Sequence, residues 1–269
     1  MATQSALITV MSRAARRAAR GLLRDFGEVE QLQVSRKGPA DFVSNADLKA
    51  ERTLREELEK ARPEFGFLME ESGATKAGDG RHRWIVDPLD GTTNFLHGVP
   101  HFAVSVAAER DGELIAGVVY EPLRDETFWA ENGAGAHLND RRLRVSARQH
   151  LRDALIATGI PFLGHGDAAA HQRYLGELGA VMGAVAGIRR WGTASLDLAY
   201  VAAGRFDGFW EHRLGPWDMA AGIVLVREAG GFVTDLEQGP NMLKTGGILA
   251  ANDHLHGPLA ELLRKAGRG

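Results

Sequence analysis

Two stretches within the first 60 residues carry apolar side chains at helical spacing. In the first stretch the apolar positions are Leu7, Val10, Met11, Ala14, Ala18 and Leu22, and Arg13, Arg16, Arg17, Arg20 and Arg24 lie opposite them. This pattern predicts an amphipathic helix with a solvated basic face, in preference to a targeting segment or an RNA-binding segment. A second helix is expected to begin near Ser44 or Asn45 and to end at Pro63, after a turn-rich connector at 37–41.

Shorter runs of strand-forming residues follow, and helices alternate with strands further along. Strands are expected at 65–68, 84–86, 102–107, 114–120 and 126–130, with a hairpin turn at Asp111-Gly112 and loops at 133–144. A second apolar pattern begins at 151–158. Beyond it the sequence predicts helices at 171–185, 193–203, 218–229 and from Gly257, with extended segments at 188–191, 206–210, 232–234 and 247–251. We therefore expect an α+β half at 1–145 and an α/β half at 146–269, packed as one compact unit.

Composition narrows the class of protein. The chain has 269 residues, 44% hydrophobic and 25% charged, as in ordinary soluble globular proteins. Its net charge of −3 makes a nucleic-acid partner unlikely, and no apolar stretch is long enough to span a membrane. The absence of cysteine excludes disulfides, thiolate metal sites and a cysteine nucleophile, and it favours a cytoplasmic location.

The segment 84–94 carries the densest chemistry. Trp84-Ile85-Val86 has the apolar character of a buried strand, and it leads directly into Asp87-Pro88-Leu89-Asp90. Two carboxylates at the end of a buried strand indicate a cation between them, because their charges would otherwise repel each other. Gly91-Thr92-Thr93 then offers backbone N–H groups and hydroxyls that suit a phosphate. Taken alone, the segment is equally compatible with a structural turn.

Other acidic residues bear on that choice. Glu70-Glu71-Ser72 follows an apolar strand, and Asp218 precedes an apolar helix, although loop glutamates and a helix N-cap are the simpler interpretations. Asp47 and Lys37 could merely form surface ion pairs. No zinc-type histidine spacing, P-loop or nucleophile elbow is present. Ligands that are all oxygen atoms favour Mg²⁺, with Mn²⁺ as a substitute.

These motifs, in this order, resemble the inositol monophosphatase family over nearly the whole chain. The matching segments are Lys37 with Pro39-Ala40-Asp41-Phe42-Val43-Ser44 and Asp47, Glu70-Glu71-Ser72, Asp87 to Phe95, Gly187-Ile188-Arg189 with Gly192-Thr193-Ala194, Trp217-Asp218, and Glu228 to Gly231. The resemblance implies a layered αβαβα sandwich of the kind shared with fructose-1,6-bisphosphatases. It also implies a homodimer, inhibition by lithium and two to three Mg²⁺ ions.

The resemblance also implies roles for individual residues. Metal ligands would be Glu70, Asp87, the Leu89 carbonyl, Asp90 and Asp218, with Asp87 shared between two ions and Glu70 shared with a third. Catalytic roles would fall to Glu70, Lys37, Thr92 and Asp47, the last two orienting and deprotonating the attacking water. Phosphate and alcohol would be bound by Asp90, Gly91, Thr92, Ala194, Glu211 and Asp218.

The expected activity is therefore Mg²⁺-dependent hydrolysis of a small phosphate monoester. The resemblance implies that myo-inositol 1-phosphate is the first choice of substrate, because Glu211 matches the acid that contacts inositol in the family. Histidinol phosphate, fructose 1,6-bisphosphate and 3′-phosphoadenosine nucleotides remain alternative substrates. A phosphoaspartate mechanism of the haloacid dehalogenase kind is disfavoured, because the aspartates are spaced Asp-x-x-Asp rather than Asp-x-Asp. A regulatory protein that binds RNA or the transcription machinery through the arginine face is the alternative from another class.

Overall fold

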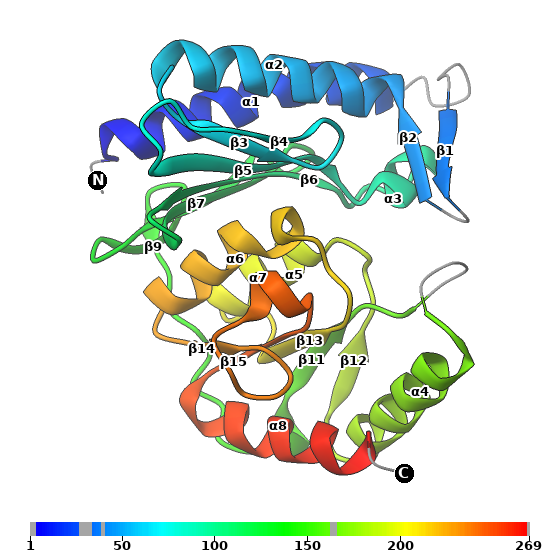
Figure 1. Ribbon diagram of the computed structural model, residues 1–269. Coiled ribbons are helices and arrows are strands. Elements are labelled where there is room, and N and C mark those ends of the chain that lie inside the picture. The colour runs from blue at the N-terminus through cyan, green and yellow to red at the C-terminus, as the bar shows by residue number, and fades with distance from the viewer. Residues whose placement is uncertain (1–3, 27–33, 39–40, 162–165, 268–269) are drawn as a thin grey trace.

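The computed structural model describes residues 4–26, 34–38, 41–161 and 166–267, and for 34–38 and 41–44 only the backbone. Helices and sheets alternate in five layers, which confirms the expected αβαβα sandwich (Figure 1). Helices α1 (Ala6–Phe26) and α2 (Asn45–Ala61) cover an eight-stranded sheet. Helices α5 (Ala194–Ala202) and α6 (Pro216–Glu228) lie between that sheet and a five-stranded one. Helices α4 (Ala168–Met182) and α8 (Asp253–Ala266) cover the far side.

The larger sheet has the strand order β10-β9-β8-β7-β6-β5-β3-β4. Its strands are β3 (Gly66–Met69), β4 (Gly73–Thr75), β5 (His82–Asp90), β6 (Ala103–Arg110), β7 (Glu113–Glu121), β8 (Glu126–Glu131), β9 (Gly135–Leu138) and β10 (Arg141–Arg142). Strands β3 and β5 run parallel, and the other neighbouring pairs run antiparallel. The five strands expected between 65 and 130 are all present, and the Asp111-Gly112 hairpin joins β6 to β7.

The smaller sheet has the order β12-β11-β13-β15-β14. Its strands are β11 (Leu155–Thr158), β12 (Gly187–Arg189), β13 (Gly208–Glu211), β14 (Phe232–Thr234) and β15 (Ile248–Ala251), and a short 3-10 turn (Leu151–Asp153) precedes β11. Strands β11, β12 and β13 are parallel, so their carboxyl ends meet at one edge of the sheet. That edge faces the cleft described below.

Several expectations about local structure are wrong. The segment 133–144, expected as loop, contains β9 and β10, because pairing with β8 satisfies their backbone groups. The connector expected at 37–41 overlaps a hairpin of β1 (Val34–Gly38) and β2 (Asp41–Ser44). Helix α8 begins at Asp253 rather than at Gly257, because Asn252 caps it by accepting bonds from two backbone N–H groups. The pattern also did not predict β4, α3 (Thr92–Leu96) or α7 (Met242–Thr245).

Alternating side chains of β5 reach the two opposite faces of the larger sheet. Trp84 and Val86 are buried with Leu54 beneath the outer helices, whereas Ile85 packs in the core that contains Leu198 of α5. Burial on both faces explains why the middle of the strand, Trp84-Ile85-Val86, is apolar. Within the described residues, no helix is both long and apolar enough to cross a membrane.

Candidate active site

One cleft of about 950 Å³ gathers acidic side chains from both halves of the chain. The end of β5, the following helix α3 and the first turns of α5 and α6 contribute residues to its walls. The expected site residues that line it are Glu70, Asp87, Leu89, Asp90, Gly91, Thr92, Ala194, Glu211 and Asp218. The structure thus brings together residues that are up to 148 positions apart (218 − 70 = 148).

The end of β5 presents Asp87 and Asp90. The pairing of β5 with β6 is irregular between these two residues, where Pro88 has no N–H group to donate. The Leu89 backbone N–H donates to Oδ1 of Asp87 at 2.9 Å. The Ser195 backbone N–H, in the first turn of α5, donates to Oδ2 of Asp90 at 2.7 Å. Asp90 therefore connects the larger sheet directly to a helix of the second half.

Asp218 reaches the same place from the first turn of α6. The simpler interpretation of Asp218 as N-cap is wrong, because Gly215 is the N-cap and Asp218 lies three residues later. The Gly215 backbone N–H donates to Oδ2 of Asp218 at 2.6 Å, which orients the carboxylate. Ser105 of β6 donates to the Trp217 carbonyl at 3.2 Å and ties the start of α6 to the larger sheet.

Asp87, Asp90 and Asp218 offer carboxylate oxygens that all lie within 4.8 Å of one another. Burial, reinforced by the charges of Glu70, Asp90 and Asp218, raises the pKa of Asp87 well above its usual value. Burial also raises the pKa of Asp90 to about 6. Burial and the charges of Asp90 and Glu70 together raise the pKa of Asp218 well above its usual value. Such a cluster of acids suits a divalent cation with oxygen ligands, because the cation would allow all of them to be ionised.

Next to the acids, Gly91 and Thr92 form the start of α3. Gly91 has φ 93°, and a Cβ atom there would lie 2.6 Å from the Thr193 hydroxyl, so only glycine fits. The Thr92 hydroxyl lies 3.0 Å from the Leu89 carbonyl oxygen and 3.2 Å from Oδ1 of Asp47. Asp47 is fully buried, so the surface position considered for it is wrong. The Lys37 side chain lies outside the described part of the chain.

On the alcohol side of the cleft, Ala194 begins α5 and Glu211 ends β13. Burial raises the pKa of Glu211 to about 8, with a further contribution from Asp90 and an opposing one from Arg190. The Glu211 carboxylate lies against Gly159, where any Cβ atom would overlap it. Gly159 follows β11, so its lack of a side chain is what gives Glu211 room at this edge.

Three residues of this region were missed by the sequence reasoning. Asn94 donates to the carbonyls of His101, at 2.9 Å, and Trp191, at 2.8 Å, and so joins α3 to the loop before α5. Arg190 lines the cleft after β12. Asp197 is buried in α5, and neither of its carboxylate oxygens has a partner within the described part of the molecule. Only Asn94, inside the 84–94 segment, carried a signal in the sequence.

The layered sandwich with its acidic cleft is the arrangement of a class of phosphoric monoester hydrolases. Residues 3–268 match the family model described as "Inositol monophosphatase family", so the chain belongs to this family.

Known relatives agree with this assignment. An inositol-1-monophosphatase of Rhizobium meliloti is 62% identical over 97% of both chains. The crystal structure of extragenic suppressor protein suhB from Bartonella henselae superposes with a TM-score of 0.94 at 60% identity, covering 97% of this chain and 99% of that one. A protein of Pseudomonas aeruginosa named Nus factor SuhB is 47% identical over 91% of both chains. The protein is therefore a phosphatase enzyme, as expected from the motifs.

Proposed function

We propose that this enzyme hydrolyses myo-inositol 1-phosphate to myo-inositol and phosphate in the presence of Mg²⁺, by direct attack of water. The observation that carries the proposal is the meeting of three carboxylates within 4.8 Å beside the Gly91-Thr92 turn, in a cleft that also contains Glu211. The first group suits cations, the second suits a phosphate, and Glu211 suits a hydroxyl-rich alcohol. The name of the Rhizobium meliloti relative supports the same substrate.

The acidic cluster by itself would repel a phosphate dianion. Two to three Mg²⁺ ions held by Glu70, Asp87, the Leu89 carbonyl, Asp90 and Asp218 would reverse the local charge, lower the pKa of the attacking water and stabilise the departing oxygen. The donor set contains only oxygen atoms, which fits Mg²⁺ and allows Mn²⁺.

Thr92 and Asp47 are placed to manage the proton of the attacking water. The Thr92 hydroxyl, 3.2 Å from the buried Asp47 carboxylate, can orient the water and pass its proton to Asp47. A bond from the water oxygen to phosphorus forms as the bond from phosphorus to the alcohol oxygen breaks. The alcohol then leaves with a proton from solvent, and no covalent intermediate on the chain is needed. Lys37 is also proposed as a catalytic residue, on the family resemblance alone.

The alcohol would lie against Glu211, Ala194 and Asp90. A carboxylate accepts hydrogen bonds from ring hydroxyls, and the backbone N–H groups at the first turn of α5 can donate to them. Asp90 and Asp218 would then contact both a cation and the substrate, as proposed from the family resemblance.

The decisive test is a phosphate-release panel with the purified protein and Mg²⁺. We expect myo-inositol 1-phosphate to give the highest kcat/KM against histidinol phosphate, fructose 1,6-bisphosphate and 3′-phosphoadenosine nucleotides, and we expect Li⁺ to inhibit. Omission of Mg²⁺ is the control. A clear preference for another member of the panel would overturn the choice of substrate while keeping the chemistry. A trapped phosphoaspartate in a single turnover would overturn direct attack by water.

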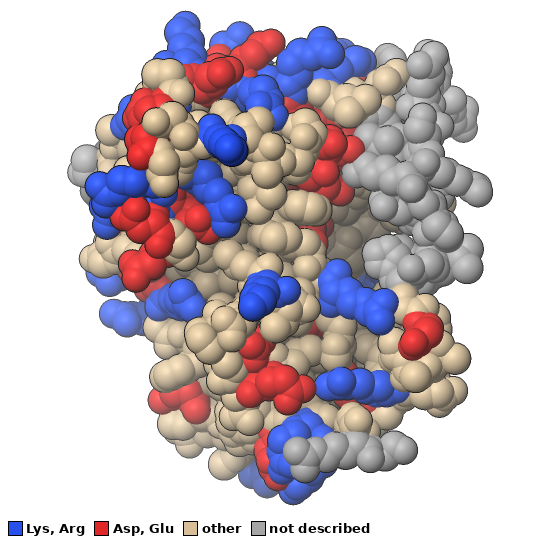
Figure 2. All heavy atoms as spheres, viewed as in Figure 1, with Lys and Arg blue, Asp and Glu red and all other residues tan. Residues whose placement is uncertain are grey.

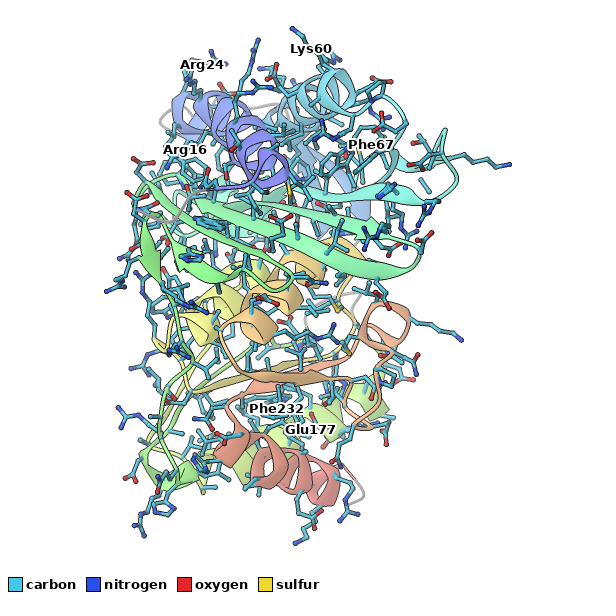
Figure 3. The ribbon with its side chains drawn as sticks, turned by 90° about the vertical axis from the view of Figure 1, so that its left-hand side faces the viewer. Arg16, Arg24, Lys60, Phe67, Glu177 and Phe232 are labelled. Carbon is cyan, nitrogen blue, oxygen red and sulfur yellow. The ribbon has the colours of Figure 1, made fainter. Side chains whose placement is uncertain are left out.

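We also propose that the protein forms a homodimer, is cytoplasmic and has no nucleic-acid partner. The arginine face of α1 is largely engaged within the chain: Arg13 and Arg17 pair with Glu57, and Arg16 pairs with Asp125. Arg24 extends from the outer side of α1 (Figure 3), whereas Arg16 donates to Asp125 and Thr127 at the start of β8. Acidic side chains are interspersed with basic ones on the face in Figure 2. The relative named Nus factor SuhB makes an RNA-binding assay worthwhile, and size-exclusion chromatography would test the dimer.

A further inference from the structure

Helix α4 and the residues that follow β13 both contribute to the lining of the cleft. Strand β13 ends at Glu211, and His212 and Arg213 continue from it along the cleft. The α4 residues that line the cleft are Ala169, Ala170, Arg173 and Tyr174. Because Glu211 is the acid on the alcohol side, the contacts between α4 and the end of β13 bear on where the alcohol would bind.

A buried carboxylate of α4 connects the helix to the end of β13. Glu177 lies one turn beyond Arg173 and is 2% exposed, and Figure 3 labels it near α8. Its Oε2 atom lies 2.7 Å from Nε2 of His212, and its Oε1 atom lies 3.1 Å from Nε of Arg173. A carboxylate only accepts hydrogen bonds, so Nε2 of His212 carries the hydrogen. Both oxygens of a side chain that does not itself line the cleft are thus bound by residues that do.

Tyr174 of α4 adds contacts to two strands of the smaller sheet. Its ring stacks on the ring of Trp210 with 6.4 Å between the centroids, and its hydroxyl oxygen lies 3.5 Å from that of Thr158. Trp210 precedes Glu211 in β13, and Thr158 ends β11 just before Gly159. Helix α4 therefore contacts β13 immediately before and immediately after Glu211. It also contacts the strand whose end leaves room for the Glu211 carboxylate.

The Glu211 carboxylate has few contacts of its own that fix its position. It accepts no hydrogen bond from the residues that the structure describes, and only burial and the charges of Asp90 and Arg190 act on its pKa. It lies against Gly159, where a Cβ atom would overlap it. A shift of the end of β13 would therefore move this carboxylate relative to the acidic cluster, because no hydrogen bond to the carboxylate resists the shift.

We propose that Glu177 is a positioning residue, which holds the end of β13 through His212 and so keeps Glu211 where it can bind the hydroxyl groups of the alcohol. This role rests on the proposed function, in which the alcohol lies against Glu211. Hydrogen bonds to a buried charged group are strong, and leaving one partner unpaired is costly, so this link can fix a strand end. It would favour hydroxyl-rich alcohols over phosphate esters that offer Glu211 no hydroxyl.

The test compares myo-inositol 1-phosphate with p-nitrophenyl phosphate, whose alcohol has no further hydroxyl for Glu211. Steady-state phosphate release with Mg²⁺ gives kcat and KM for each substrate. In Glu177→Ala we expect KM for myo-inositol 1-phosphate to rise about tenfold with little change in kcat, and both constants for p-nitrophenyl phosphate to stay the same. Glu177→Gln keeps an oxygen that accepts from His212 and should restore most of the affinity. Glu237→Gln is the matched control, because the Glu237 side chain lies 3.8 Å from the same Arg173 but is 81% exposed.

A second comparison shows whether Glu177 acts through Glu211. In a Glu211→Gln background, Glu177→Ala should raise KM for myo-inositol 1-phosphate little further. Equal losses for the two substrates, a full further rise in the Glu211→Gln background, or an unchanged KM overturns the positioning role. Melting temperatures verify folding. If Glu177→Ala does not fold, His212→Ala removes the same link and leaves Glu177 paired with Arg173, and the same rise in KM is expected only when Glu211 is present.

Crystal structures of the unaltered protein and of the variant that lacks the link separate this role from the proposed function. A Glu211 carboxylate displaced from Gly159 supports the positioning role even if no phosphate ester is hydrolysed, a result that would contradict the proposed function alone. A Glu211 carboxylate that stays in place overturns the positioning role even if the enzyme hydrolyses myo-inositol 1-phosphate well.

Discussion

Asp90 joins three parts of the candidate active site. It ends β5, it accepts a hydrogen bond from Ser195 at the start of α5, and its carboxylate belongs to the cluster with Asp87 and Asp218. If this cluster binds a cation as proposed, Asp90 has both a cation-binding role and a structural one. The two roles can be separated, because an amide keeps the acceptor oxygen and removes the charge.

Asp90→Asn should therefore abolish turnover and leave the fold intact. The amide oxygen can still accept from the Ser195 N–H, whereas the lost negative charge weakens cation binding, so phosphate release should fall by ~10³-fold. Phosphate release with saturating Mg²⁺ and thermal melting check the two halves of the expectation. Near-normal activity would contradict the assignment of Asp90 as a ligand.

Glu211 should make the metal-free protein less stable as the pH rises. Its pKa in the folded state is raised to about 8 by burial, so the folded state holds the proton more tightly than the unfolded state, where the usual pKa of 4.5 applies. The stabilisation from protonated Glu211 is complete below pH 4.5 and is lost progressively up to about pH 8.

Glu211→Gln removes that dependence. Relative to the unaltered protein without metal, the melting temperature of the variant should increase between pH 5 and pH 8. Its free energy of unfolding should be about 1–3 kcal/mol higher than that of the unaltered protein at the upper end. Glu59→Gln, an exposed change on α2, is the matched control and should show no such trend. A constant difference at all pH values would contradict protonation of Glu211 in the folded protein.

At the scale of elements, the contact of α6 with the larger sheet depends on Gly117 of β7. A Cβ atom at Gly117 would lie 2.5 Å from the Ala221 carbonyl oxygen and 2.8 Å from its Cα atom, so backbone itself would have to move. Because Asp218 starts the same helix, the closeness of β7 and α6 also determines where this carboxylate lies relative to β5.

Gly117→Ala should destabilise the protein by about 1–3 kcal/mol or more and lower activity with it. Gly21→Ala in α1, where nothing lies within 4 Å of the new atom, should instead stabilise by about 0.5–1 kcal/mol through helix propensity. Denaturant unfolding of both variants tests the pair. Similar effects of the two changes would show that β7 and α6 can separate without penalty.

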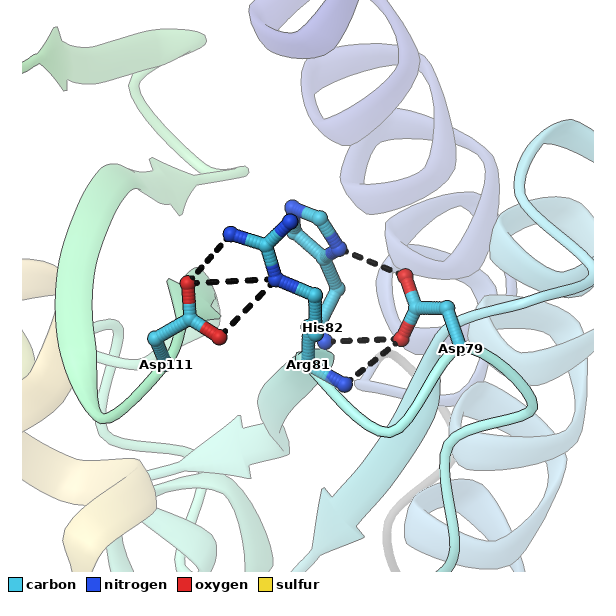
Figure 4. Close-up of polar contacts among 4 residues, drawn as sticks. All are labelled: Asp79, Arg81, His82 and Asp111. Atoms are coloured by element: carbon cyan, nitrogen blue, oxygen red, sulfur yellow. Dashed lines mark hydrogen bonds and ion pairs between the residues drawn. The ribbon is translucent and has the colours of Figure 1, made fainter.

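The Asp111-Gly112 hairpin shows what local sequence does predict well. Both residues have positive φ, 53° and 85°, as a two-residue turn between twisted strands requires. Asp111 also forms an ion pair with Arg81, while Asp79 accepts backbone N–H groups from Arg81 and His82 (Figure 4). Those backbone bonds lower the pKa of Asp79 to about 2. These surface contacts refine the turn and were not needed to predict it.

At the scale of the whole molecule, the candidate active site gathers acidic groups that are far apart in the chain, and their mutual repulsion disfavours the folded state. Burial and mutual repulsion raise the pKa values of Asp87 and Asp218, one from each half. Cations bound between them should therefore favour the folded state.

Mg²⁺ should raise the melting temperature by roughly 5–10 °C at a concentration about 100-fold above its Kd, which corresponds to about 2.7 kcal/mol for one ion. Differential scanning calorimetry with Mg²⁺ and with a chelator makes the measurement. Asp90→Asn should show a smaller rise. An equal rise in that variant would place the stabilising cation elsewhere.

Much of the fold was predictable because its signals are local. Periodicity predicted α1, α2 and the strands between 65 and 130. The residue types of the segment Asp87 to Thr93 indicated a site for a cation and a phosphate. Strands β9 and β10 were not predictable, because short segments become strands through pairing with a neighbour rather than through their own composition. Likewise, Asn94 and Arg190 acquire their places only from contacts across the fold.

The sequence by itself determined the class of chemistry, since the types and order of the acidic, glycine and threonine residues indicate an oxygen-ligand cation site beside a phosphate. Only the tertiary structure decided that Asp47 is buried, that Asp218 is oriented by Gly215, and that Arg190 and Arg213 share one edge of the smaller sheet. The reason is physical: burial, pKa and pairing depend on distances between residues remote in the chain, and only packing brings those residues together.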